Sequence, residues 1–242
     1  MKIAMDAGHG GSDSTPGKRS PDGEYEWNFN NTVVMAFMEE LSTYENVQLL
    51  RVDDETGKKD VSLTNRTNAA NSWGADMYLS FHHNANSGSW GRWTGTETFV
   101  YTKASRKSQQ IAKSVQLALL QAYNLKDRGV KAADLHVLRE TTMPAILIEG
   151  GFMDSLIDIK RLRSSKVLRQ AGINAAIAVA KLENLKKKPG NTGIFHTVRY
   201  GDTLWGLSKQ YNSTVANLKL WNGLSSDSIY EGDILKVRHS KS

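Results

Sequence analysis

The sequence contains no cysteine among its 242 residues. Disulfide bonds and thiolate metal sites are therefore excluded, and any transition metal would have to be bound by His, Asp or Glu side chains. Zinc accepts such nitrogen and oxygen ligands. Because domains typically run to about 100–200 residues, the length predicts one good-sized α/β domain and a small second domain.

Long hydrophobic runs are also missing from the chain. No apolar run reaches the roughly 20 residues that a membrane-spanning helix requires. Residues Met1 to Asp6 lead directly into a predicted strand, without the apolar core that a signal peptide would have. We therefore expect a soluble protein that has no membrane partner and no export signal.

The sequence has fewer acidic than basic residues. The 31 Lys and Arg residues and 25 Asp and Glu residues give a formal net charge of +6. Such a balance favours an anionic partner, which can be a nucleic acid, a membrane surface or a bacterial wall polymer. Charge alone does not choose among these partners. No nucleic-acid-binding motif accompanies it, so we do not expect a nucleic-acid partner.

Short apolar segments alternate with helical periodicity through the first part of the chain. The predicted strands are 2–6, 47–52, 77–81, 96–102, 135–139 and 145–148. The predicted helices lie near residues 29–41, 66–73, 111–123 and 167–185. This alternation predicts an α/β fold with a mostly parallel sheet of about six strands and helices on both faces.

Residues 186–193 break the pattern with three lysines, a proline and two glycines. None of these residue types builds a core, so we expect a linker between a first domain at 1–185 and a second at 194–238. The second segment is too short for another enzyme and suits a small binding module.

The run from Ala145 to Gly151 ends a predicted buried strand on the carboxylate of Glu149. A lone buried carboxylate is costly, so a nearby group must compensate for it. His9 and His82 follow two other predicted strands. Taken singly, each of these residues has an ordinary role in a turn or loop, but three such strand ends together indicate a metal site.

Zinc in a hydrolase takes three protein ligands and leaves one position for water. The candidates are His9, one of Glu24 and Glu26, and one of His82 and His83. Side chains alternate along a strand, so only one of the two neighbouring histidines can face the metal. Glu26 lies at the start of a predicted helix and can face the sheet, whereas Glu24 lies farther out on the loop.

A metal-bound water also needs a base that later protonates the leaving nitrogen, and a carboxylate can do both. Glu149 is placed for that role at the end of its strand.

Several blocks in the first domain resemble the zinc-dependent N-acetylmuramoyl-L-alanine amidases over about residues 1–183. They are Asp6–Gly11, Glu26 by a helix, Asn68–Asn71, Ser80–Asn84, Gly95–Glu97, Arg128–Val130 and Met143–Phe152. The resemblance implies that His9, Glu26 and His82 bind zinc and that Glu149 is catalytic. Glu-Trp-Asn-Phe-Asn at 26–30 matches phage-type members, which favours Glu26 over Glu24.

The tail resembles a LysM module, which implies a βααβ fold and binding of glycans that contain N-acetylglucosamine. The matching residues are His196–Ser208, Tyr211, Leu218, Trp221, Asn222, Ile229–Asp233 and Leu235. The residues agree, because Asp202 or Thr203 can cap a helix that starts near Leu204. We expect Trp205 to pack in the core, and binding loops after Gly201 and around residues 228–229.

The two resemblances together imply a peptidoglycan hydrolase that uses Zn²⁺ to cleave the amide between the lactyl group of N-acetylmuramic acid and L-alanine. The LysM module would hold the enzyme on the glycan. One alternative is a zinc peptidase acting within the stem peptide; another is a non-catalytic wall-binding protein, which should lack a ligand or Glu149. Without a signal peptide, we expect release by a holin or by lysis, as for phage endolysins and mother-cell autolysins.

Overall fold

The computed structural model describes residues 1–10, 19–188, 194–224 and 226–238. The chain divides into two compact units, Met1–Lys186 and Lys187–Ser242. Of the expected linker, residues 189–193 lie outside the described part. The first unit contains two hydrophobic clusters and the second unit contains a third.

The first unit is built on a six-stranded sheet with the order β2-β1-β3-β6-β4-β5. Its strands are β1 (Lys2–Ala7), β2 (Gln48–Arg51), β3 (Met77–Asn84), β4 (Thr96–Val100), β5 (Asp127–Ala132) and β6 (Ala145–Phe152). Neighbouring strands are parallel except β4 and β6, which are antiparallel. The predicted mostly parallel sheet of about six strands is confirmed.

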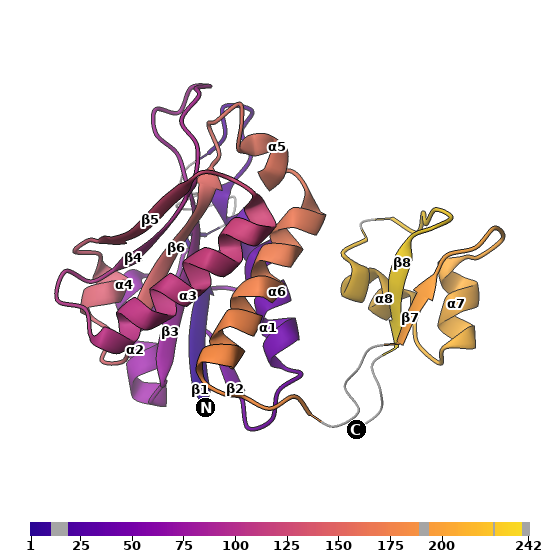
Figure 1. Cartoon of the computed structure of the whole chain (residues 1–242), viewed down its shortest axis with the longest axis horizontal. Coiled ribbons are helices and arrows are strands. Elements are labelled where there is room, and N and C mark those ends of the chain that lie inside the picture. The colour runs from indigo at the N-terminus through magenta and orange to yellow at the C-terminus, as the bar shows by residue number, and fades with distance from the viewer. Residues whose placement is uncertain (11–18, 189–193, 225, 239–242) are drawn as a thin grey trace. The chain divides into compact units, whose positions relative to one another are not determined.

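Helices cover both faces of this sheet. They are α1 (Glu26–Leu41), α2 (Leu63–Trp73), α3 (Arg106–Tyr123), α4 (His136–Arg139), α5 (Ile159–Leu162) and α6 (Ser165–Leu182). On one face α6 packs between α1 and α3, as Figure 1 shows, over the larger core, which includes Phe37, Ile111 and Ile148. On the other face Val137 and Leu138 of α4 pack in a smaller core with Tyr78 and Leu147.

The predicted strand 135–139 is wrong, because residues His136–Arg139 form helix α4. Val137 and Leu138 are adjacent and both buried, which one side of a helix allows and an alternating strand does not. The fifth strand in the sequence is instead β5 (Asp127–Ala132), an edge strand that is polar and mostly half-buried. It lacks the apolar run from which buried strands are predicted.

Two strands are longer than the sequence predicted. β3 continues to Asn84 and β6 to Phe152, so His82, His83 and Glu149 lie within strands and not after them. Glu26 is the first residue of α1. The polar side chains of His82, His83 and Glu149 therefore lie on the rigid carboxyl-terminal ends of two central strands, and Glu26 lies on a helix.

The second unit has the order β7 (Ile194–Thr197), α7 (Leu204–Gln210), α8 (Val215–Asn222) and β8 (Ile234–Arg238). β7 and β8 pair antiparallel, which confirms the predicted βααβ fold. The hydroxyl of Thr203 accepts a hydrogen bond from the Gly206 amide and caps α7, as expected.

The prediction that Trp205 packs in the core is wrong, because this side chain is 67% exposed. Leu204 and Leu207 face the core. Trp205 follows Leu204 by one position, which turns its side chain about 100° around the helix and toward solvent. Trp221, by contrast, packs against the small core of this unit.

Candidate metal centre

Three side chains from different parts of the first unit meet at one point. His9, Glu26 and His82 each offer one ligand atom, and these atoms all lie within 4.8 Å of one another. Nε2 of His9 is 3.3 Å from Oε2 of Glu26, and Nδ1 of His82 is 2.9 Å from Oε1. Each carboxylate oxygen therefore faces a different histidine.

The pairing of β1 with β3 brings the two histidines together. Ala7 is the partner of Phe81, and the Gly8 amide donates a hydrogen bond to the Phe81 carbonyl at 2.9 Å. A Cβ atom at Gly8 would lie 2.0 Å from Cε1 of His82, so only glycine leaves room for this imidazole. His9 has a φ of 65°, a left-handed conformation that is uncommon outside glycine.

Arg66 holds the loop that carries His9. Its guanidinium donates to the carbonyl of His9 at 2.8 Å and to the carboxylate of Asp6 at 3.0 Å, and both charged side chains are buried. Sequence reasoning used Arg66 only to mark a helix and missed this role. Asp6 was the sequence feature that could have indicated this role, because a buried carboxylate in β1 requires a cationic partner.

Glu26 is 1% exposed and receives hydrogen bonds from the His83 amide at 3.1 Å and the Asn30 side chain at 3.4 Å. Burial alone would raise its pKa, but the hydrogen bond and charge of His82 and the charge of His9 lower the pKa to about 2. Glu26 is therefore an anion between two imidazoles, which suits a bound cation.

The pKa of His82 shifts in the opposite direction. Burial lowers it, but the hydrogen bond and charge of Glu26, with the charge of Glu149, raise the pKa to about 9. In the metal-free protein a proton on His82 thus balances the buried carboxylate. A cation bound by both groups would take over that role and displace the proton.

The three residues fit a zinc ion in their chemistry, and they lie close enough together to surround one. A pair of histidines with one glutamate is a donor set found in zinc hydrolases. Tetrahedral bonds of 2.0–2.2 Å would place ligand atoms about 3.4 Å apart. The ligand atoms of His9, Glu26 and His82, one from each residue, all lie within 4.8 Å of one another, a wider spacing that still lets all three surround one ion.

His83 and Glu24, the alternative ligands, lie outside the cluster. His83 points to the other side of β3, where Nδ1 is 2.7 Å from Oδ1 of Asn30 and Nε2 is 3.0 Å from the Tyr123 hydroxyl. Burial lowers the pKa of His83 to about 4, so it is neutral. Glu24 instead pairs with Arg163 at 2.8 Å.

Glu149 lies beside the cluster on the same face of the sheet as His82. The two residues are partners in the pairing of β3 with β6. Partners on adjacent strands project to one side, with the strands about 4.8 Å apart. A carboxylate is thereby held next to the candidate metal ligands without being one of the three clustered groups.

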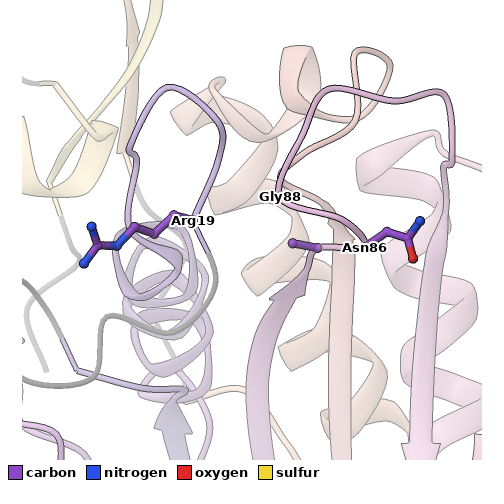
Figure 2. A pocket seen from close by; sticks show the side chains of 4 residues that line it. Arg19, Asn86 and Gly88 are labelled. Atoms are coloured by element: carbon purple, nitrogen blue, oxygen red, sulfur yellow. The ribbon is translucent and has the colours of Figure 1, made fainter.

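A pocket of about 230 Å³ lies at the same edge of the sheet and is lined by Arg19, Ala85, Asn86 and Gly88. Figure 2 shows Arg19 on one segment and Asn86 and Gly88 on another, with the guanidinium of Arg19 pointing away from Asn86. Asn86 lies only four residues beyond His82, so the pocket adjoins the strand that carries this histidine.

Comparison with known proteins identifies both units. Residues 3–181 match the family described as N-acetylmuramoyl-L-alanine amidase. The chain belongs to this amidase family. Residues 196–238 match the LysM domain. The predictions of an N-acetylmuramoyl-L-alanine amidase, of a peptidoglycan hydrolase and of a C-terminal LysM module are confirmed.

Relatives and solved structures agree with this assignment. The N-acetylmuramoyl-L-alanine amidase CwlM of Bacillus licheniformis is 40% identical over 190 residues, 77% of this chain and 70% of the relative. An endolysin of Bacillus phage SPP1 is 34% identical over 196 residues, 78% of this chain and 69% of the relative. The crystal structure of an N-acetylmuramoyl-L-alanine amidase from Clostridium difficile 630 matches with a TM-score of 0.69 and 29% identity, covering 76% of this chain and 96% of that one.

Among the residues that the structure describes, no helix is both long and apolar enough to cross a bilayer.

Proposed function

We propose that this amidase cleaves the bond between the lactyl group of N-acetylmuramic acid and L-alanine with a zinc ion held by His9, Glu26 and His82, and with Glu149 as the general base and acid. The observation that carries the proposal is the pairing of Glu149 with His82 across β3 and β6, beside the three clustered donors. Zinc, when bound, would polarise the amide carbonyl and lower the pKa of a coordinated water to about 7.

The protein groups have separate tasks in this proposal. The imidazoles of His9 and His82 would bind through nitrogen lone pairs and Glu26 through its anionic carboxylate, oriented by the amide of Asn30 at 3.4 Å. The carboxylate of Glu149 would take a proton from the attacking water and return it to the nitrogen of L-alanine as the amide bond breaks. Nitrogen then leaves as a neutral amine.

The proposed domain limits are 1–185 for catalysis, 186–193 for the linker and 194–238 for the LysM module. Three aromatic side chains on the surface of the second unit support a role in wall binding: Tyr200 is 92% exposed, Trp205 67% and Tyr230 72%. Exposed aromatic rings offer an apolar face and a polar tip, which suits a sugar surface. The substrate polymer would thus also be the anchor, and the enzyme would act at the bacterial cell wall.

Mass spectrometry of digested peptidoglycan tests the proposed reaction. We expect stem peptides with a free amino group on L-alanine and glycan strands with an intact lactyl carboxylate. New amino termini inside the stem peptide, with the muramoyl amide intact, would instead identify a peptidase and contradict the proposal.

A further inference from the structure

A row of charged side chains crosses the sheet beside Glu149. Glu149 is the partner of His82 on one side and of Glu97 in β4 on the other. Because partners on adjacent strands share a face, these three side chains project from the same surface. The next strand, β5, extends the row with Arg128 and Lys131, which both form ion pairs with Glu97.

Glu97 lies at the centre of the group that it forms with Arg128 and Lys131. It is 3% exposed, and its Oε2 accepts from Nε of Arg128 at 2.7 Å while its Oε1 accepts from the Asn84 amide at 3.1 Å. Burial raises its pKa, but Lys131 and Arg128 lower it overall, so Glu97 is ionised. Two cations and one carboxylate leave this end of the row with a net positive charge.

Arg128 retains hydrogen-bonding capacity after this contact. Its side chain is 31% exposed, and only Nε contacts Glu97. The two terminal nitrogens donate to none of the residues that the structure describes. Its guanidinium carbon lies 5.0 Å from the centre of the Phe152 ring. A guanidinium that is fixed by a carboxylate and a ring, with both terminal nitrogens still able to donate, is preorganised to bind a carboxylate.

Lys131 lies close to the same point. Its side chain is 40% exposed, and it is the partner of Phe99 in the pairing of β4 with β5. Phe99 is two residues from Glu97, so Lys131 projects from the same face as the rest of the row. An anion in front of Glu97 could therefore contact both cations.

We propose that Arg128 and Lys131 bind a carboxylate of the stem peptide, and that Glu97 is the positioning residue that holds both cations in place. The inference rests on the proposed function, because it takes Glu149 as the site of cleavage. Once the lactyl group is in amide linkage, the glycan strand offers no free carboxylate. The anion therefore has to come from the peptide side of the scissile bond.

The spacing of the row fits this direction of binding. Adjacent strands lie about 4.8 Å apart, so β5 is about 10 Å from the strand that carries Glu149. An extended peptide advances about 3.3–3.6 Å per residue. The second or third residue of the stem peptide would thus bring its carboxylate to Arg128.

The test uses the full chain and three synthetic N-acetylmuramoyl tripeptides. One has free carboxylates on residues two and three, one is amidated on residue two, and one on residue three. Amidation of the recognised carboxylate should raise KM about tenfold, at the low end for a hydrogen bond to a charged group. The kcat should change less than about twofold, because the contact is remote from the scissile bond. The stem-peptide residue whose amidation raises KM is the one whose carboxylate is recognised.

Variants separate recognition from folding. Arg128→Gln should raise KM about tenfold on the free substrate and leave KM on the matching amidated substrate unchanged. Lys131→Gln should also raise KM on the free substrate. This variant provides the test if Arg128→Gln does not fold. Arg139→Gln is the control, because Arg139 is 39% exposed on α4 and also pairs with two carboxylates. It should change neither KM.

Three results would overturn the inference. They are equal KM values for free and amidated substrates, an equal loss on both substrates in the two row variants, or no loss in either variant. In each case normal release of L-alanine termini by the unmodified enzyme would leave the proposed function intact. If the unmodified enzyme released no such termini from any substrate, the proposed function would fail and this inference with it.

Discussion

The two units of the chain place their functional groups in opposite ways. In the first unit Glu26 is 1% exposed and accepts a hydrogen bond from the His83 amide, and its neighbour His82 lies on a strand of the sheet. In the second unit Tyr200 is 92% exposed and Trp205 67%. A reaction centre needs atoms fixed to within a fraction of an ångström, whereas an anchor needs accessible contact area. Substitutions in the two units should therefore impair different measurable steps.

The largest effect is expected at the candidate ligands. His9→Ala, Glu26→Ala and His82→Ala should each lose zinc and nearly all activity, since the three donor atoms lie within 4.8 Å of one another. Metal content after dialysis measures this. Glu24→Ala and His83→Ala are the matched controls and should keep their zinc. Zinc loss in Glu24→Ala, with retention in Glu26→Ala, would overturn the assignment.

Removing the second unit should have a smaller and selective effect. A chain that ends at Leu185 keeps both cores of the first unit and all four proposed site residues. It should cleave soluble muropeptides at the normal rate but act about tenfold or more slowly on intact walls, because the high local concentration given by the anchor is lost. Equal rates on intact walls at low enzyme concentration would show that the LysM module is not the anchor.

A single exposed aromatic residue should give the smallest effect. Trp205→Ala should weaken binding of the full chain to insoluble peptidoglycan by about two- to tenfold, the range expected for one aromatic contact. Sedimentation with purified walls measures it, and turnover of soluble substrate should stay unchanged. Leu117→Ala is the control, because Leu117 is 64% exposed but belongs to the first unit. A similar loss in both variants would argue against a glycan contact at Trp205.

Sequence patterns predicted the elements that are apolar and buried. β1, β3 and β6 were found because each carries a continuous run of buried residues. The edge strand β5 was missed because it is polar and mostly half-buried, and the apolar run near Leu135 was assigned to a strand although it forms α4. Local patterns identify burial well but do not show which element type provides it.

The candidate site shows the same limit. Alternation along β3 correctly predicted that His82 and His83 face opposite sides, and the start of the helix placed Glu26 near the sheet. Asp6 indicated that a cationic partner was needed but not which one, because Arg66 reaches the His9 carbonyl across 57 positions of sequence. Such long-range hydrogen bonds depend on the sheet order and leave no periodic signal.

The most direct test of the central claim is the turnover of Glu149→Gln, measured together with its zinc content. Glutamine keeps the size of the side chain but cannot accept the proton from water or return it to the leaving nitrogen. We expect normal zinc binding, an unchanged unfolding temperature and a loss of roughly 100-fold or more in kcat on a soluble muropeptide. Near-normal turnover with zinc bound would contradict the role of Glu149 and the mechanism built on it.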